Sequence, residues 1–257
     1  MATLPDDRWL LVCDVDGTLL LPERENPGLE EFNRFIESNR GRIVFAINTG
    51  RSLDEVATVA EAGPIVTPEW LACGVGTSLY SGFTPDTADS GWERALSREW
   101  NREEIRAALS GCPGIFEQEA WNQHGARLSY YIQGPVPEIL PGVLARVEPW
   151  KDSIKRVVAL DYYLDFMPLW AGKGGAAAYL AEKLGIPSER VLVAGDSGND
   201  RDMLEREFRP IVVANHASDL DDFVECPGVF RSRSPAAAGV LEGLAHFGAL
   251  SADATAR

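Results

Sequence analysis

The stretch WLLVCDVDGTLL, residues 9–20, decides the fold of this chain. Residues 9–13 form a compact apolar run, which is typical of a strand buried on both faces of a parallel sheet. In an extended chain, residues i and i+2 point the same way, so Asp14 and Asp16 can face one site. Gly17 allows a sharp turn past them, and Thr18 can hydrogen-bond a carboxylate or a phosphate. The pattern predicts a functional edge at the carboxyl end of this strand.

A second strand delivers aspartates in the same way, in VLVAGDSGNDRDML, residues 191–204. Asp196 follows the apolar run, and Asp200 comes four residues later. At one sheet edge, these carboxylates and those of Asp14 and Asp16 would repel one another unless a hard cation held them. Oxygen ligands of this kind suit Mg²⁺. The sequence therefore predicts a Mg²⁺ site built from Asp14, Asp16, Asp196 and Asp200.

Two weaker signals are typical of anion binding. In INTGRS, residues 47–52, Thr49 follows an apolar run and precedes a glycine, and Ser52 with Glu55 forms a capping box that opens a helix. A helix N-terminus with nearby backbone N–H groups suits an anion. Lys173 begins the helical stretch KGGAAAYL, but no Ser or Thr follows it, so this is not a Walker A motif.

The remaining pattern alternates strands and helices and is interrupted once. Before residue 82 and after residue 168, strands are expected at 9–13, 43–47, 65–67, 71–73, 190–194 and 211–214, and helices at 27–39, 52–61, 173–184, 199–205 and 235–247. Between them, helices are expected at 92–100, 102–109 and 137–147, and strands at 115–119, 127–133, 156–160 and 162–167. The prediction is an α/β fold: a Rossmann-like doubly wound parallel sheet core, residues 1–81 and 169–257, with an inserted smaller α/β cap domain, residues 82–168.

Composition excludes several classes of function. The 257 residues include 24 Lys and Arg against 39 Asp and Glu, a net charge of −15, which argues against nucleic-acid or membrane partners. The four cysteines form no Cys-x-x-Cys pair and are expected to be reduced thiols. The absence of a signal-peptide pattern and of a long apolar run favours a cytoplasmic protein. His124, His216 and His246 form no ligand-spaced cluster, and Gly74-Val75-Gly76 lacks the third glycine of a dinucleotide fingerprint.

In this order, the motifs DVDGTLL, NTGRS, Lys173 and GDSGND resemble those of the haloacid dehalogenase-like phosphatases. The insert resembles the α/β cap of the sugar-phosphatase branch of that superfamily. Within the branch, RLSYYI (127–132), AGKGGAAAYL (171–180) and IVVANH (211–216) favour the sucrose-phosphate phosphatases. The resemblance covers the core, about two thirds of the chain, and is patchier in the cap.

The resemblance implies a role for each matched position. Asp14 would attack phosphorus and form an aspartyl-phosphate, and Asp16 would protonate the leaving oxygen and later activate water. Asp196 would bind Mg²⁺ with Asp14 and the backbone carbonyl of Asp16. The remaining matched positions would support the metal or hold the phosphoryl group: Thr49, Gly50, Arg51, Lys173, Asn199 and Asp200.

The implied activity is Mg²⁺-dependent hydrolysis of a sugar phosphate in sucrose biosynthesis, by a monomer, with sucrose 6F-phosphate or a related glycosyl phosphate as substrate. The insert holds many of the large aromatics, and Gln118 and Tyr130 are the expected sugar contacts. One alternative is a phosphomutase, since phosphomannomutases resemble this branch in cap type and also begin with Asp-Val-Asp-Gly-Thr. Another is a non-catalytic, phosphatase-like regulatory module, although such modules usually lack one of the acidic residues.

Overall fold

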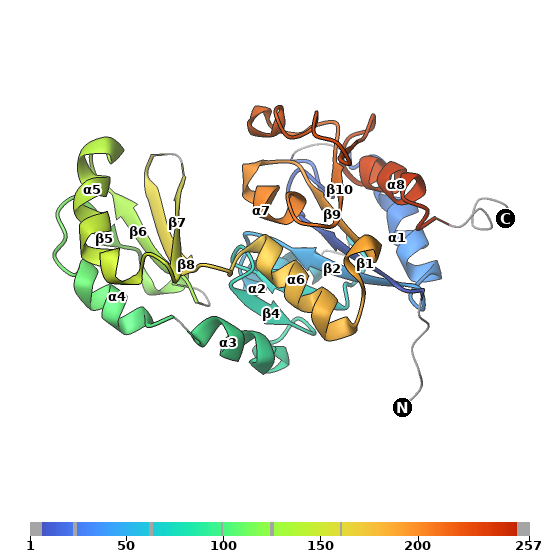
Figure 1. Ribbon diagram of the computed structural model, residues 1–257. Coiled ribbons are helices and arrows are strands. Elements are labelled where there is room, and N and C mark those ends of the chain that lie inside the picture. Colours follow the sequence, from blue (N-terminus) through green and yellow to red (C-terminus); the bar gives the residue numbers. More distant parts are fainter. Residues whose placement is uncertain are drawn as a thin grey trace.

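A computed structural model of the chain describes residues 7–22, 25–61, 64–98, 100–123, 126–159 and 161–250. Within these ranges the strands form two separate sheets, one of seven strands in the order β11-β10-β9-β1-β2-β3-β4 and one of four in the order β5-β6-β8-β7. Figure 1 shows the two sheets in separate parts of the molecule, which we call the core and the cap. The predicted α/β class, with a parallel core sheet and a small second sheet, is confirmed.

The core sheet places β1 at its centre. Its strands are β1 (Trp9–Cys13), β2 (Ile43–Asn48), β3 (Trp70–Cys73), β4 (Ser78–Tyr80), β9 (Val191–Gly195), β10 (Arg209–Val212) and β11 (Phe230–Arg231). Neighbouring strands are parallel except β3 and β4, which are antiparallel. Cys13 pairs with Ile47 on one side and with Ala194 on the other. The residues that follow β2, β1 and β9 therefore emerge side by side at one edge.

Helices cover both faces of this sheet because successive strand residues point to opposite sides. Leu11 and Cys13 pack with α1 (Leu29–Ser38), α2 (Leu53–Glu61) and α8 (Ala236–His246). Leu10 and Val12 pack with α3 (Ser90–Ser97), α6 (Lys173–Leu184) and α7 (Arg201–Leu204). All four strand residues are fully buried. The result is the doubly wound arrangement that the alternating sequence predicts.

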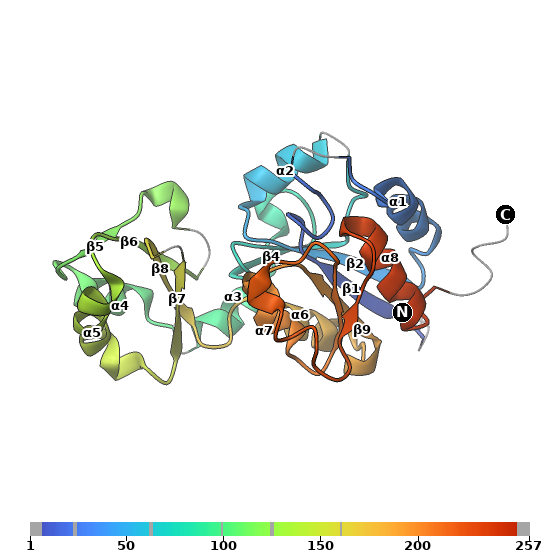
Figure 2. The ribbon, with the colours of Figure 1, turned by 90° about the horizontal axis from the view of Figure 1, so that it is seen from above.

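The cap is an antiparallel sheet with two helices on one face. Its elements are α4 (Arg102–Leu109), β5 (Ile115–Glu117), β6 (Leu128–Ile132), α5 (Val136–Val147), β7 (Ile154–Ala159) and β8 (Tyr163–Pro168). Leu128, Tyr130 and Phe166 pack against α4 and α5 in a cluster separate from the core. In Figures 1 and 2, β7 and β8 lie on the core side of the cap, and α5 lies farther away.

One predicted strand is wrong, and two strands were not predicted. Residues 65–67 are not a strand, although Ile65 and Val66 are buried in the core. The Asn33 amide replaces a partner strand here, since it donates to Pro64 O at 2.8 Å and accepts from Val66 N–H at 2.9 Å. The unpredicted strands, β4 and β11, are three and two residues long. The other predicted elements are present, with ends that differ by a few residues.

The boundaries at residues 81/82 and 168/169 stay a prediction, because α3 lies inside the predicted insert and yet packs Trp92 and Leu96 into a core cluster.

All four cysteines are free thiols: Cys226 is exposed, and Cys13, Cys73 and Cys112 are buried. In the part of the chain that the structure describes, no helix is long and apolar enough to cross a membrane.

Candidate active site

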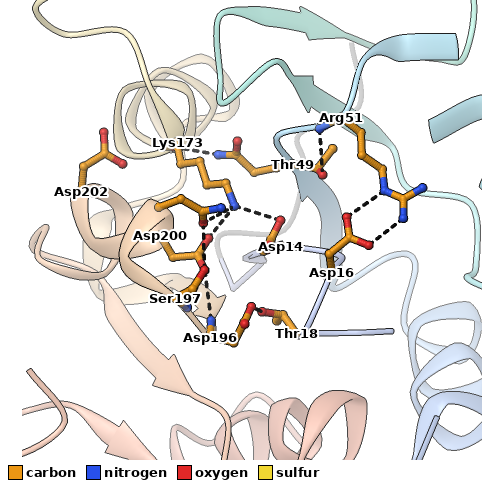
Figure 3. Close-up of polar contacts among 12 residues, drawn as sticks. Asp14, Asp16, Thr18, Thr49, Arg51, Lys173, Asp196, Ser197, Asp200 and Asp202 are labelled. Carbon is orange, nitrogen blue, oxygen red and sulfur yellow. Dashed lines mark hydrogen bonds and ion pairs between the residues drawn. The ribbon is translucent and has the colours of Figure 1, made fainter. Parts of the chain in front are cut away.

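The four sequence motifs meet at the carboxyl edge of the core sheet, as Figure 3 shows. Asp14 follows β1, Thr49 follows β2, Asp196 follows β9, and Lys173 is the first residue of α6. Because these three strands are adjacent and parallel, their ends bring together residues up to 182 positions apart in sequence (196 − 14). The backbone N–H of Asp14 donates to Ala194 O at 3.0 Å, which joins two of the motifs directly.

Lys173 is the central cation of the site and is fully buried. Its Nζ lies 2.8 Å from Asp14 Oδ1, 2.6 Å from Asp200 Oδ1 and 3.1 Å from Asn199 Oδ1. Burial lowers the pKa of Lys173, but the charges of Asp200 and Asp14 outweigh it and hold the pKa above its ordinary value. Lys173 is therefore a charged ammonium between two carboxylates.

Three carboxylates form a candidate metal centre. Asp14, Asp196 and Asp200 each place one carboxylate oxygen within 4.8 Å of the others. Asp196 Oδ1 accepts from the Thr18 hydroxyl at 2.8 Å, the carboxylate bond that the sequence allowed for Thr18. Oδ2 of Asp196 lies so close to Gly17 that a Cβ there would overlap it. Gly17 has a φ of 88°, so glycine is required both by the turn and by the carboxylate beside it.

Asp200 holds this cluster together from within the protein. It is fully buried, and its Oδ1 accepts from Lys173. Its Oδ2 accepts from the backbone N–H groups of Asp196 and Ser197, at 3.0 and 3.2 Å. These bonds close the short turn Gly198–Asp200 and fix the loop that carries Asp196. Both oxygens of Asp200 are thus engaged with protein donors.

The charges of the cluster fit a divalent cation. Burial raises the pKa of Asp14, and the charge of Lys173 opposes this shift. Burial, together with the charge of Asp200, raises the pKa of Asp196 to about 6. Three carboxylates against one ammonium leave two negative charges (1 − 3 = −2) in a poorly solvated place. Hard oxygen ligands with excess negative charge are what a divalent metal such as Mg²⁺ binds.

The carboxylate of Asp16 is turned away from this cluster. Its two oxygens accept from Arg51 Nε at 2.7 Å and Arg51 Nη2 at 2.6 Å. Figure 3 shows Asp16 directed toward Arg51, whereas Asp14 is directed toward Lys173. The hydrogen bonds that Arg51 donates to Asp16 raise the pKa of Arg51 above its ordinary value. Arg51 was predicted to bind the phosphate, and its pairing with Asp16 was not predicted. The sequence signal for this pair is the arginine two residues after Thr49.

The positions predicted to bind the phosphate follow β2, the strand beside the one that ends at Asp14. Thr49 is buried at the end of β2, and its Oγ1 accepts from the backbone N–H of Arg51 at 3.3 Å. Gly50, between them, is exposed. The predicted capping box is confirmed: Ser52 N–H donates to Glu55 Oε2 at 2.7 Å, and Glu55 N–H donates to Ser52 Oγ at 3.4 Å.

Two residues that the sequence analysis did not select support the site. Asn215 donates to Gly17 O at 2.7 Å and accepts from the backbone N–H of Ala236 at 2.9 Å, so it joins the turn after Asp14 to α8. Asp202 accepts from Gly174 N–H at 2.8 Å and pairs with Lys155 of the cap at 3.1 Å. Asp202 follows Asp200 by two positions in the same motif, and this spacing was the available signal.

The predicted sugar contacts lie in the cap rather than beside the acidic cluster. Gln118 Nε2 donates to Tyr130 O at 3.0 Å. Both residues are buried, and Tyr130 packs edge to face on Phe166 in the cap cluster. Direct contact of Gln118 or Tyr130 with a sugar stays a prediction.

Known proteins resemble this chain over both its core and its cap. A family model described as sucrose-6F-phosphate phosphohydrolase matches residues 7–248. Sucrose-phosphatase 1 of Nicotiana tabacum is 30% identical over 252 residues, which cover 93% of this chain and 59% of the tobacco protein. Mannosylfructose-phosphate phosphatase of Agrobacterium fabrum is 29% identical over 243 residues, which cover 93% of this chain and 96% of that protein.

Solved structures extend the similarity to the fold. The crystal structure of the sucrose-phosphatase from Synechocystis, in complex with sucrose and phosphate, has a TM-score of 0.78 at 25% identity and covers 93% of this chain and 98% of that one. The family model spans core and cap together, from before β1 to beyond α8. The chain therefore belongs to the sucrose-6F-phosphate phosphohydrolase family.

Proposed function

We propose that this chain is a metal-dependent phosphatase of glycosyl phosphates, with sucrose 6F-phosphate as its first candidate substrate and mannosylfructose phosphate as the second. One observation carries the proposal: Asp14 ends the central strand with its carboxylate 2.8 Å from the Lys173 ammonium and within the Asp196–Asp200 cluster. A buried carboxylate held beside a fixed cation is suited to attack a phosphate, because the cation offsets the charge of both groups.

The proposed reaction has two steps. Asp14 attacks phosphorus, so that a bond from Asp14 to phosphorus forms and the bond to the sugar oxygen breaks. Water then attacks phosphorus, the bond to Asp14 breaks, and phosphate is released. Lys173 and Thr49 hold the phosphoryl oxygens in both steps. Asp14, Asp196 and the backbone carbonyl of Asp16 would hold Mg²⁺, which when bound supplies positive charge that balances the carboxylates and the phosphate.

Asp16 has the role of the proton carrier. It would give a proton to the sugar oxygen in the first step and take one from the attacking water in the second. Because both of its oxygens are bound to Arg51, Asp16 has to leave Arg51 before it can serve the leaving group. A substrate phosphate that enters beside Thr49 offers Arg51 another anionic partner, which favours that exchange.

The cap is proposed to recognise the sugar through its uncovered face. Phe116, Tyr131 and Tyr163 lie across β5, β6 and β8 in one register row, and Val157 lies on the same face of β7. Phe116, Val157 and Tyr163 are exposed, whereas the opposite face is covered by α4 and α5. Aromatic faces of this kind pack well against sugar rings. The two candidate substrates are those named for relatives of this chain.

The test is phosphate release across a panel of esters in the presence of Mg²⁺. The panel holds sucrose 6F-phosphate, mannosylfructose phosphate, glucosylglycerol phosphate, fructose 6-phosphate and p-nitrophenyl phosphate. We expect hydrolysis of a disaccharide phosphate without any sugar bisphosphate. Asp14→Asn should lower the rate by about a thousandfold, because an amide cannot form the acyl-phosphate. A requirement for a bisphosphate would indicate a mutase, and inactivity on the whole panel would contradict the proposal.

A further inference from the structure

The turn at residues 74–76, between β3 and β4, has an unusual backbone. Gly74, Val75 and Gly76 have φ angles of 57°, 59° and 75°, so three successive residues are left-handed. For glycine this costs little, but Val75 is β-branched, and the left-handed region is strained for such residues. Strain of this kind persists only where the surroundings hold it in place. Neither a dinucleotide nor the proposed reaction explains this turn.

On one side, the turn holds the loop that carries Thr49. The backbone N–H of Val75 donates to Thr49 O at 2.9 Å, and that of Gly74 donates to Arg51 O at 2.9 Å. The turn itself is closed by Thr77, which is buried and whose hydroxyl donates to Gly74 O at 2.8 Å. Two bonds to residues on either side of Gly50 leave that loop little freedom to move.

On the other side, the turn touches the segment that carries Lys173. A Cβ on Gly76 would overlap the carbonyl oxygen of Gly172 and lie 3.0 Å from Lys173 N. The end of β2 contacts the same segment, because Asn48 Nδ2 donates to Lys173 O at 2.8 Å. Asn48 is fully buried, so this bond is protected from water. The two backbones are therefore as close as a glycine at position 76 allows.

We propose that the turn at residues 74–76 is a positioning element of the phosphate site, which sets the spacing between Thr49 and Lys173. Gly76 is the residue on which this spacing depends, since a larger side chain would push Gly172 and Lys173 away from the Thr49 loop. The inference rests on the proposed function in one respect, namely that Thr49 and Lys173 bind the phosphoryl oxygens. The site needs both groups on one phosphate, and they come from different elements.

Gly76→Ala tests the proposal, with Gly248→Ala as the matched control. Gly248 has a φ of 78°, close to that of Gly76, but a Cβ there would meet nothing within 4 Å. Both variants therefore carry similar backbone strain, and only Gly76→Ala moves Lys173. Binding of inorganic phosphate to the full chain with Mg²⁺ is measured by calorimetry. We expect Kd to rise about tenfold in Gly76→Ala and to change less than about twofold in Gly248→Ala. An unchanged Kd in folded Gly76→Ala would overturn the proposal.

If Gly76→Ala does not fold, Val75→Gly tests whether the turn at residues 74–76 positions the phosphate site. This variant keeps the N–H donor to Thr49 and removes the strained φ, so it should melt within about 4 °C of the parent. Three successive glycines hold the turn less rigidly, and we expect phosphate to bind about threefold more weakly. Equal binding by Val75→Gly and the parent would then overturn the proposal.

Binding also separates this inference from the proposed function. A parent protein that binds phosphate but hydrolyses none of the sugar phosphates would contradict the function, while the binding data on the variants would still decide the inference. A parent protein that binds no phosphate would overturn the inference itself.

Discussion

Lys173 is the residue on which the charge balance of the site depends. It is fully buried, and its ammonium contacts Asp14 and Asp200 at once. Removing one partner of a buried ion pair leaves an unpaired charge, which typically costs about 3–5 kcal/mol. The excess of acidic groups over this single ammonium is the physical reason to expect that a divalent cation stabilises the folded protein as well as its activity.

Mg²⁺ should therefore raise the melting temperature, and Asp196 should be needed for this effect. Saturating Mg²⁺, at about a hundred times its Kd, stabilises a single site by about 2.7 kcal/mol, which is a shift of several degrees. In Asp196→Asn the shift should be largely lost, whereas in Asp54→Asn, an exposed position in the first turn of α2, it should persist. Differential scanning calorimetry measures both, and equal shifts in the two variants would remove Asp196 from the metal site.

The pair of Asp16 and Arg51 gives a prediction about leaving groups. Asp16→Asn should slow hydrolysis of a sugar phosphate much more than that of p-nitrophenyl phosphate, because nitrophenolate leaves without a proton. The measurement is kcat on both substrates. Equal losses would show that Asp16 does not protonate the leaving oxygen.

This pair also shows where residue-scale prediction stops. The rule that residues i and i+2 point the same way holds only while the chain stays extended. After β1 the chain bends, since Gly17 N–H donates to Leu20 O at 2.7 Å, and Asp16 turns to Arg51. Asp14 and Asp196 were predicted to meet because both follow strand ends, and Lys173 was joined to them through the family resemblance. The direction of Asp16 depends on a distant side chain.

At the scale of elements, one carboxylate links the start of α3 to α6 of the core. Asp89 Oδ1 caps the helix, since it accepts from Trp92 N–H at 2.8 Å, and it also accepts from Tyr179 Oη at 2.7 Å. Its Oδ2 lies 2.9 Å from Lys183 Nζ. Burial raises the pKa of Asp89, but the bonds from Lys183, Tyr179 and Trp92 outweigh it and hold the pKa below its ordinary value.

Asp89→Ala should thus destabilise the protein by about 1 kcal/mol at neutral pH, from the loss of the cap. A lowered pKa in the folded state adds stability that is complete above the unfolded value and is lost as the pH falls through the folded value. The difference between parent and variant should therefore shrink below about pH 4. Urea unfolding of both proteins at neutral and acidic pH measures this difference in the free energy of unfolding. Asp89→Asn keeps the capping oxygen and removes the charge. If Asp89→Asn loses as much stability as Asp89→Ala, the charge of Asp89 contributes more to stability than its capping hydrogen bond does.

Elements were predictable where their bonds are local. The capping box of Ser52 and Glu55 spans three residues, and both of its bonds are present. The false strand at 65–67 had the apolar residues of a strand, but the side chains of Asn33 and Arg40 bond the Val66 N–H and Thr67 O in place of a partner strand. Sequence patterns report burial, and they do not report which distant side chain replaces a strand partner.

At the scale of the whole molecule, the cap and the core have separate hydrophobic clusters, and their side-chain contacts include an ion pair. One of these contacts, between Lys155 on β7 and Asp202 on α7, reaches the first turn of α6 through Gly174. In the proposed function the core would bind the phosphate that all candidate substrates share, so discrimination between sugars is expected from the cap.

Tyr163→Ala should separate sugar recognition from chemistry. Tyr163 is 38% exposed on the uncovered face of the cap sheet and contacts Tyr131 and Tyr162. Its loss should raise KM for a disaccharide phosphate about tenfold, while p-nitrophenyl phosphate is hardly affected. The same assay on Tyr130→Phe tests the earlier assignment of the buried phenol. Equal effects of Tyr163→Ala on both substrates would show that this face does not bind the sugar.

The positions of the four thiols allow the order in which core and cap unfold to be measured by alkylation. Cys226 is exposed and should be alkylated at once, whereas Cys13 and Cys73 in the core sheet and Cys112 in the cap react only when their surroundings open. Because Cys112 belongs to a smaller cluster than Cys13, it should be labelled earlier as urea is added. The order in which the three buried thiols gain mass, read by peptide mass spectrometry, thus reports whether cap and core come apart as one cooperative unit or as two.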